Sequence, residues 1–328
     1  GTTLDVAVLR RGLPELSERG ARIGDFQTSV RAMAVQTIGL GGDSEIDLSG
    51  WPAVRLGPRR VIPICRLAET EPRCAQRLPD LLRDVLSRTR HATDVVALTG
   101  HTDPATDRIL AQLTDGPLLL STLAQRLNRP AADYLPWQAL EDHGRLRRYG
   151  LTLTDVLHVQ GHFSAFDGAL SQAVLDHWAM LLEASREEIL EAILHEFRRL
   201  VIDTVLSVGL PPRSPGSNGG DLRHWLTSRM ADHEPEGEAL LECRMRVPLV
   251  GVGAPVGALF PSLSRHLGTD VILGDLSPVA NAVGAIAGDV MLREIATVRI
   301  RDDGVFVCSW RGGADRVDSI LVVTASPE

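Results

Sequence analysis

Aromatic residues are scarce in this sequence of 328 residues, where they make up 4% of the positions. The hydrophobic core must therefore rely on Leu, Val, Ile and Ala. Cysteine is also scarce: the sequence has 4, scattered and without CxxC spacing. Four isolated cysteines in a chain of this length exclude a disulfide framework and are typical of reduced thiols in the cytoplasm.

Long apolar runs and an excess of basic residues are missing as well. No run is long enough to cross a bilayer, and the first residues lack a basic and then apolar signal. The net charge of −8 argues against a general nucleic-acid binder, which would carry a basic face. With 44% apolar and 23% charged residues, the composition predicts a soluble cytoplasmic protein of two or three domains.

Glycine-rich turns are the most informative feature that is present. Residues 36–44 (QTIGLGGDS) place three glycines within four positions, after an apolar run and before an acid and a hydroxyl. Similar turns occur at residues 1–5 (GTTLD) and 251–255 (GVGAP). Because glycine has no Cβ, its backbone N–H groups can converge on an anion. Three such turns at strand ends suggest one nucleotide-phosphate site assembled from distant segments.

The first turn offers the N–H of Gly1, the hydroxyls of Thr2 and Thr3, and the carboxylate of Asp5. A β-hairpin of this kind can surround a γ-phosphate, with the acid as a Mg²⁺ ligand through water and a candidate catalytic group. The alternative is a plain turn before a strand. Taken alone, the motif has little specificity.

The second turn adds the N–H groups of Gly39, Gly41 and Gly42, with Asp43 as a candidate catalytic residue that orients a metal or water. The alternative is a tight turn that leads into a helix capped by Asp43 or Ser44. Both interpretations stay open on the sequence alone.

The third turn, with Gly251, Gly253 and Ala254, follows a predicted strand and opens a predicted helix. This position suits a nucleotide moiety at the carboxyl end of a sheet. Ordinary turn chemistry between a strand and a helix is the favoured alternative when the motif is considered alone.

The pattern of elements is α/β. A buried strand is expected at residues 4–9, followed by a hairpin turn at residues 10–14. The remaining expectations for the first hundred residues are strands near 27–34, 54–60 and 94–100, and a helix within 71–90.

Residues 105–155 resemble an inserted module of three helices (107–113, 118–127 and 131–143) and a small β wing, the pattern of a winged helix. DNA binding is one interpretation and a structural or protein-contact module is the other. We favour the second, because Pro136, Glu141 and Asp142 in the presumed recognition helix suit phosphate contacts poorly.

Residues 156–208 are predicted to be helical. Ser185 and Glu188 form a capping box, and a core-facing stripe follows it. The stripe comprises Ile189, Ile193, Phe197, Leu200, Val201 and Thr204. A loop or linker is expected at 209–221. Strands and helices then resume, with strands at 247–250, 270–273, 297–308 and 317–324 and helices at 255–267 and 277–288.

Metal and covalent catalysis have weaker support. His158 and His162 would share a helical face, but Gly161 between them disfavours a helix, and Asp176 and His177 lie nearby. Solvated or capping histidines are the favoured interpretation. No cysteine has an evident histidine partner, and the sequence contains no GxSxG motif.

Together these segments resemble the hydantoinase A/oxoprolinase family, in order and over nearly the whole chain. Residues 1–7 (GTTLDVA) are similar to its second phosphate motif, Asp-x-Gly-Gly-Thr-Thr-x-Asp-Val-Ala. Further similar blocks are residues 37–44 (TIGLGGDS), 56–59 (LGPR), 151–156 (LTLTDV), 251–255 (GVGAP) and 279–285 (VANAVGA). Their joint specificity is high, although each block alone is modest.

The resemblance implies an actin-like (ribonuclease-H-like) ATPase fold that closes on Mg-ATP. Residues 1–104 and 222–328 would form its α/β domain, with the winged-helix-like insert at 105–155, a helical segment at 156–208 and a linker at 209–221. The implied reaction is ATP-dependent opening of a small cyclic amide, such as 5-oxoproline or a hydantoin, after phosphorylation of the amide oxygen.

The resemblance also implies residue roles. Thr2, Thr3 and Asp5 would hold phosphate and magnesium, and the turn at 39–43 would line the same cleft. The turn that contains Gly251, Gly253 and Ala254 would lie beside the nucleoside.

The sequence departs from the family pattern in several places. The first phosphate motif, the N-terminal domain, and the aspartate and first glycine of the second motif are absent, Leu4 replaces a usual threonine, and Leu153 stands where proline is common. We therefore expect a missing N-terminal half or a partner subunit, in a homo- or hetero-oligomer. The alternatives are a non-catalytic ATP-binding scaffold protein and a winged-helix regulator with an ATPase-like sensor domain.

Overall fold

The computed structural model is a mixed α/β structure with two compact units, residues 1–279 and 280–328. It describes residues 2–14, 16–17, 22–23, 26–27, 32–100, 102–103, 105, 107–210, 219–231, 244–287, 297–300, 306–310 and 313–317. None of the described helices is both long enough and apolar enough to cross a membrane.

The first unit begins with an antiparallel pair, β1 (Leu4–Ala7) and β8 (Val35–Ile38), in which Leu4 lies opposite Ile38. The prediction of a buried strand is wrong in one respect. Burial alternates along β1, because Leu4 and Val6 pack on the core while Asp5 and Ala7 are exposed.

Six short strands lie between β1 and β8. They are β2 (Leu9–Arg10), β3 (Leu13–Pro14), β4 (Leu16–Ser17), β5 (Arg22–Ile23), β6 (Phe26–Gln27) and β7 (Ala32–Met33). The expected hairpin turn is confirmed, since β2 and β3 pair around Arg11 and Gly12, which both have positive φ. The strand expected near 27–34 is represented by β6 and β7 at its ends.

The segment after β8 carries the second sheet and the first helices. Its elements are β9 (Ser44–Asp47), β10 (Arg55–Arg60), β11 (Ile62–Pro63), η1 (Ile64–Arg66), α1 (Leu67–Thr70), α2 (Pro72–Leu82) and β12 (Val95–Leu98). Strands β9 and β10 pair antiparallel. The predicted strands at 54–60 and 94–100 and the helix within 71–90 are therefore confirmed.

The expected insert has a small core of its own around Trp137, Leu110 and Leu123. Its elements are α3 (Arg108–Ala111), β13 (Leu118–Leu119), α4 (Leu120–Arg126), η3 (Ala132–Tyr134), α5 (Trp137–Asp142) and β14 (Leu146–Gly150). Strand β14 pairs with both β11 and β12 in a sheet of order β11-β14-β12-β13. It is an interior strand of this sheet, where the sequence suggested a separate wing.

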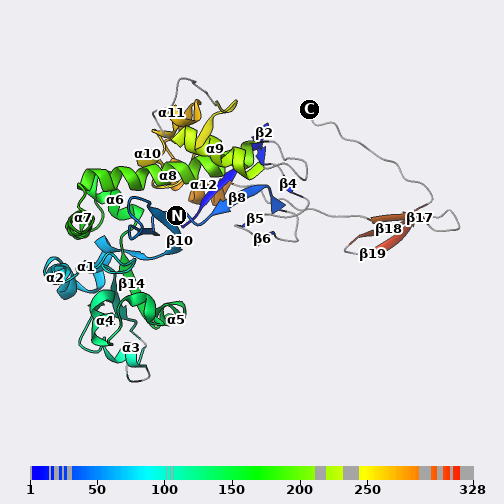
Figure 1. Cartoon of the computed structure of the whole chain (residues 1–328). Helices are drawn as coiled ribbons and strands as arrows, with labels where there is room; N and C mark the ends of the chain where they lie inside the picture. The colour runs from blue at the N-terminus through cyan, green and yellow to red at the C-terminus, as the bar shows by residue number, and fades with distance from the viewer. Residues whose placement is uncertain are drawn as a thin grey trace. The chain divides into compact units, whose positions relative to one another are not determined.

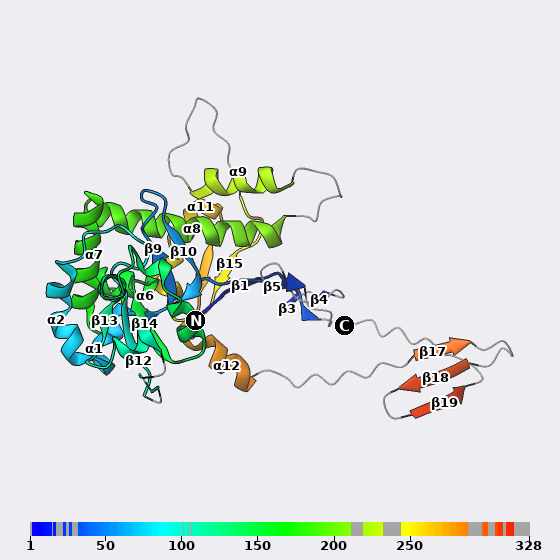
Figure 2. The same ribbon diagram turned by 60° about the horizontal axis from the view of Figure 1, so that its bottom comes forward.

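Four helices follow: α6 (Leu153–Val159), α7 (Gly168–Leu182), α8 (Arg186–Gly209) and α9 (Gly219–Ala231). The Ser185–Glu188 capping box at the start of α8 is confirmed, and Ile189, Ile193 and Phe197 are buried as predicted. Helix α9 runs alongside α8 in both views (Figures 1 and 2). The predicted linker at 209–221 is shorter at both ends, because Gly209 and residues 219–221 are helical.

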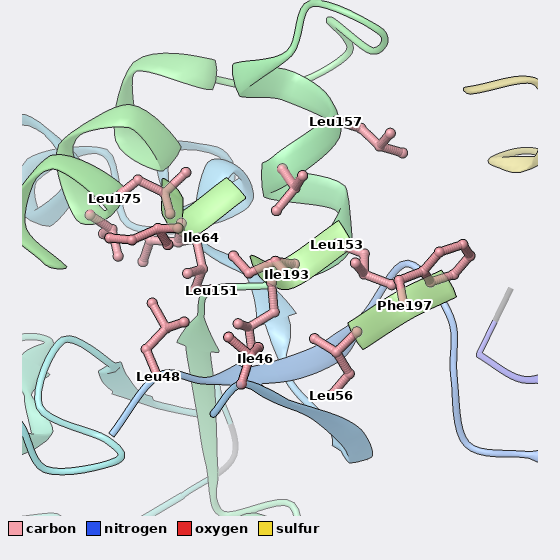
Figure 3. Packing of buried hydrophobic residues seen from close by; sticks show 14 of the residues in the cluster. Ile46, Leu48, Leu56, Ile64, Leu151, Leu153, Leu157, Leu175, Ile193 and Phe197 are labelled. Carbon is pink, nitrogen blue, oxygen red and sulfur yellow. The ribbon is translucent and has the colours of Figure 1, made fainter. Parts of the chain in front are cut away.

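The core of the first unit joins these helices to the β9–β10 sheet. Figure 3 shows Ile46 and Leu56 of that sheet facing Ile193 and Phe197 of α8, with Leu153 of α6 beside them. The first turn of α6 is thereby fixed next to the sheet that follows the glycine turn.

A parallel pair, β15 (Leu249–Gly251) and β16 (Val271–Leu273), ends the first unit. The helix expected at 255–267 is divided into α10 (Val256–Leu259) and α11 (Leu263–Leu267), because Pro261 cannot donate a helical hydrogen bond. A short η4 (Ser277–Val279) follows β16.

The second unit contains α12 (Ala280–Ala287) and an antiparallel sheet of β17 (Thr297–Ile300), β18 (Phe306–Trp310) and β19 (Gly313–Val317). The strand predicted at 317–324 lies outside the described residues after Val317.

Candidate functional site

The β1–β8 pair brings two of the three predicted phosphate turns together. Leu4 and Ile38 are opposite one another in an antiparallel register. The residue before Leu4 and the residue after Ile38, which are Thr3 and Gly39, therefore leave the pair at the same end. The sequence motif at residues 2–5 and the start of the glycine turn at residues 39–43 thus lie at one edge of this strand pair. Gly1 lies outside the described residues.

Asp5 is the centre of a small hydroxyl–carboxylate cluster at this edge. The Thr3 hydroxyl donates to Asp5 Oδ2 over 2.9 Å, and the Thr37 hydroxyl donates to Asp5 Oδ1 over 2.6 Å. Thr37 lies opposite Asp5 in the register, so the strand pairing creates the second contact. The carboxylate is exposed, and each oxygen keeps a second lone pair for a ligand. Thr37 was not among the predicted site residues, although it begins the similar block at residues 37–44.

The glycine turn is packed closely on its own surroundings. A Cβ at Gly39 would lie 3.0 Å from the Pro58 Cβ, and one at Gly42 would lie 2.9 Å from the Thr154 hydroxyl. Internal packing thus accounts for these two glycines. The predicted helix cap at Asp43 or Ser44 is wrong, because Ser44 begins β9 and its hydroxyl accepts from the Gly41 N–H over 2.8 Å.

Asp43 has an incomplete set of partners. Its Oδ2 accepts from Arg60 Nε over 2.7 Å, whereas its Oδ1 is buried and has no hydrogen-bond partner among the described residues. Within the same described part, neither the Gly42 nor the Asp43 N–H donates a hydrogen bond. Buried polar atoms usually have a partner, so an orphaned carboxylate oxygen beside two such N–H groups marks a place for a ligand.

The third turn has a different role in the structure. A Cβ at Gly251 would lie 2.7 Å from Leu273 Cδ2, so this glycine packs closely between β15 and β16. Gly253 has a φ of +121° and its N–H donates to Ser277 O over 2.7 Å, while Ala254 is exposed. Within the described residues, no hydrogen bond or ion pair joins this turn to Asp5 or to Asp43.

A buried charge cluster lies next to the glycine turn and was missed by the sequence analysis. Arg148 of β14 is fully buried and donates to Asp94 over 2.7 Å, to Glu45 over 3.0 Å and to Glu141 over 3.2 Å. Its Nη2 also donates to the backbone oxygen of Arg60 over 3.4 Å. The cluster connects β9 to helix α5 of the insert.

The acids in this cluster titrate differently. Burial alone would raise the pKa of Asp94, but hydrogen bonds and charge from His91 and Arg148 hold that pKa below its ordinary value. Burial is the larger effect at Glu141 and raises its pKa, against the opposing effect of Arg148. The sequence does carry a signal for this cluster, which is the pair Arg147 and Arg148 within a predicted strand. A charged residue that is buried in a strand seldom lacks a partner of opposite charge.

Asp155 was also missed as a separate residue, although it lies in the block LTLTDV. It caps the first turn of α6 with Thr152, and its carboxylate accepts from Thr152, Cys65 and Ser171. It is fully buried. The pattern Thr-x-x-Asp is a capping-box signal and could have identified it.

The candidate metal histidines have structural roles. His158 Nδ1 lies 2.8 Å from Thr154 O, and its Nε2 accepts from the Phe166 N–H, which uses both ring nitrogens. His177 Nε2 bonds to Val85 O, and burial lowers the pKa of this imidazole. Within the described part of the chain, no group of three or more His, Cys, Asp or Glu side chains is arranged to hold a metal ion.

Comparison with known proteins finds similarity to solved structures. No family model and no curated protein matches the sequence. The nucleotide-free structure of an acetone carboxylase, described as acting in ATP-dependent acetone carboxylation, matches with a TM-score of 0.47 and 13% identity. The match covers 91% of this chain and 29% of the acetone carboxylase chain, so this chain spans less than a third of that protein.

Proposed function

We propose that this chain is the second, hydantoinase-A-like domain of an enzyme that uses Mg-ATP to open a cyclic amide such as 5-oxoproline or a hydantoin. One observation carries the proposal. The β1–β8 register places the Thr3–Asp5 hydroxyl–carboxylate cluster and the turn with Asp43 at the same end of one strand pair. The order of the sequence blocks supports the same assignment.

The residues at this edge suit the binding of a phosphate. Thr2 provides a hydroxyl donor, and the unused N–H groups of Gly42 and Asp43 provide backbone donors, while the Thr3 hydroxyl orients Asp5. Fixed donors of this kind stabilise charge that develops on a phosphoryl group during transfer. The ATP would transfer its γ-phosphoryl group to the amide oxygen and leave as ADP, and water would then add to the carbon that carries this oxygen. Breaking the C–N bond, with a proton passing to the nitrogen, would open the ring and leave an acyl phosphate, which a second water would hydrolyse to a carboxylate and inorganic phosphate.

A magnesium ion is compatible with these residues. Mg²⁺ keeps several waters and is usually held by one or two carboxylates together with substrate phosphates, so a cluster of three protein acids is unnecessary. Asp5 is exposed and oriented by two hydroxyls, which fits a ligand through water. The orphaned Asp43 Oδ1 fits a partner such as a polarised water or the hydrated ion. We assign metal binding to Asp5 and a supporting catalytic role to Asp43.

We propose that two further segments complete the site. We place the nucleoside beside the turn of Gly251, Gly253 and Ala254, as the family resemblance implies. The first phosphate motif would come from an N-terminal half or a partner subunit. We also propose that the enzyme acts in the cytoplasm.

Calorimetric titration of Mg-ATP into the natural polypeptide or assembly that contains this chain tests the proposal. We expect Asp5→Asn and Asp43→Asn each to weaken binding at least about tenfold, the size of a lost hydrogen bond to a charged group. Asp115→Asn is the matched control, because Asp115 is exposed in the turn between α3 and β13. It should bind Mg-ATP as the unaltered protein does.

Phosphate release then tests the reaction. Release that is stimulated by 5-oxoproline or a hydantoin and lost in Asp43→Asn supports the enzyme. Mg-ATP binding that depends on Asp5 and Asp43, without stimulation by any cyclic amide, would identify a non-catalytic ATP-binding protein. Equal binding in Asp5→Asn, Asp43→Asn and Asp115→Asn would refute the site itself.

A further inference from the structure

Helix α6 holds the glycine turn through a single carbonyl group. Both the Thr154 N–H, at 2.9 Å, and the Thr154 hydroxyl, at 2.8 Å, donate to the backbone oxygen of Gly42. Thr154 is in the first turn of α6, where backbone N–H groups have no partner inside the helix. The Gly42 oxygen therefore satisfies one of these N–H groups, and the hydroxyl adds a second donor to the same acceptor.

This carbonyl contact sets the direction of the next N–H group. Among the described residues, the cis peptide bonds are those before Pro52 and Pro58, so the Gly42–Asp43 bond is trans. In a trans peptide the C=O and the following N–H point in opposite directions. Because Thr154 draws the Gly42 oxygen towards α6, the Asp43 N–H must point away from α6. This N–H is one of the two unused donors of the turn.

Several contacts hold the helical turn that contains Thr154 in place. The carboxylate of Asp155, in the same turn, accepts hydrogen bonds from Thr152, from Cys65 of η1 and from Ser171 of α7. On the other side, Gly42 has no Cβ and lies so close that an added Cβ would be 2.9 Å from the Thr154 hydroxyl. The turn cannot move away from α6 without breaking two hydrogen bonds.

We infer that Thr154 is a positioning residue for phosphate binding: it fixes the Gly42–Asp43 peptide so that the Asp43 N–H is presented to an anion. The inference rests on the proposed function, because it names what holds that site in shape. It adds a residue that the sequence analysis left without a role. Thr154 acts through the peptide group and does not touch the ligand.

Two variants test the role of the hydroxyl. Thr154→Val keeps the shape and the N–H of residue 154 but removes the hydroxyl, and Thr154→Ser keeps the hydroxyl. Thr114→Val is the matched control, because its hydroxyl also donates to a backbone carbonyl, that of Ala111 over 2.9 Å, in the insert. The probe is Mg-ATP, titrated into the natural polypeptide or assembly.

Two measurements are needed. We expect Thr154→Val to weaken Mg-ATP binding by about two- to tenfold, the usual range for one hydrogen bond, with recovery in Thr154→Ser and no change in Thr114→Val. Without nucleotide, Thr154→Val should alter the NMR shift and the hydrogen exchange of the Asp43 N–H, and Thr154→Ser should restore both. A merely structural contribution to α6 would lower stability without this selective change at Asp43.

The outcomes separate this inference from the proposed function. If Asp43→Asn weakens Mg-ATP binding and Thr154→Val does not, the proposed site stands and the role of Thr154 is refuted. An unchanged Asp43 N–H in Thr154→Val refutes it as well. If the Asp43 N–H changes in Thr154→Val but no variant affects Mg-ATP, the proposed nucleotide site fails, and with it the role of Thr154 in phosphate binding.

Discussion

Asp155 and Asp43 follow the two residues that join helix α6 to the glycine turn, Thr154 and Gly42, and their carboxylates differ in how fully their oxygens are bonded. Asp155 is buried and accepts from five donors: Thr152 N, Thr152 Oγ1, Ile64 N, Cys65 N and Ser171 Oγ. Asp43 lies in the turn itself, where Arg60 contacts one oxygen and the other is buried without a partner among the described residues.

The comparison separates a structural acid from a candidate functional one. A carboxylate whose lone pairs are filled by the protein fixes three segments of the chain and has no capacity for a ligand. A carboxylate with an orphaned oxygen carries an energetic cost that the fold alone does not offset. We therefore expect substitutions at Asp155 to affect folding and substitutions at Asp43 to affect binding.

Asp155→Ala should cause the largest loss of stability. It leaves the N–H groups of Ile64 and Cys65 buried without a partner and removes the Asp155 half of the capping box of α6. We expect the free energy of unfolding to fall by about 4–5 kcal/mol, as when several bonds to a buried charge are lost. Urea denaturation measures it. Asp167→Ala, which removes a single exposed cap of α7, should cost about 1 kcal/mol, and an equal effect at the two sites would contradict the comparison.

Arg148→Met should have the next largest effect. It takes the arginine away from the buried Asp94 and Glu45, which keep their contacts with His91 at 3.1 Å and Arg90 at 2.8 Å, and a loss of about 3 kcal/mol is expected at pH 7. The pKa of Asp94 is lowered in the folded protein, so its stabilising contribution is present above its ordinary value and is lost as the pH falls through the lowered one.

The pH dependence distinguishes a charge effect from a packing effect. In Arg148→Met the buried Asp94 loses a charge that lowers its pKa and can become neutral by binding a proton, so the deficit relative to the unaltered protein should shrink as the pH falls from 7 to 4. Denaturation at pH 7 and pH 4 compares the two. A deficit that is the same at both values would assign the loss to the packing of Arg148 against Trp137 instead.

Gly57→Ala tests whether the turn that carries Asp43 is held as tightly as the structure indicates. Gly57 has a φ of +59°, and a Cβ there would lie 2.4 Å from the Gly39 oxygen. Gly144 has a similar φ of +66° with no atom within 4 Å of an added Cβ. We expect Gly144→Ala to cost about 1 kcal/mol for the backbone alone and Gly57→Ala to cost about 2–3 kcal/mol.

The difference between these two glycine variants in thermal denaturation isolates the contact with the glycine turn. Equal costs would mean that Gly39 moves aside freely, in which case the turn is not fixed before a ligand binds.

Local signals predicted much of the fold. The capping box at Ser185 and Glu188 and the helical stripe of α8 were visible in the sequence because they depend on residues three or four positions apart. The prediction of one helix at 255–267 is wrong, because Pro261 separates α10 from α11. The role of β14 could not be seen, since its pairing with β11 and β12 joins residues far apart in the chain.

The candidate site was only partly visible for the same reason. The motifs identified Asp5 and Asp43, but the contact from Thr37 to Asp5 depends on the strand register. The contact between Thr154 and Gly42 joins segments that are 112 residues apart. At Gly251 the glycine turn is present, but the glycine packs closely against Leu273. No local sequence pattern distinguishes a glycine that makes room for packing from one that makes room for a ligand.

Asp43→Asn should have the smallest effect on folding. The amide removes a charge whose Oδ1 has no partner in the described part of the chain, and it gives up only the pair with Arg60, whose side chain is 60% exposed. Exposed ion pairs contribute little, so we expect the free energy of unfolding to stay within about 0.5 kcal/mol of the unaltered protein. The same variant should lose Mg-ATP affinity. A fall in stability comparable to that of Asp155→Ala would show that Asp43 is a structural acid too, and the contrast between the two carboxylates would be lost.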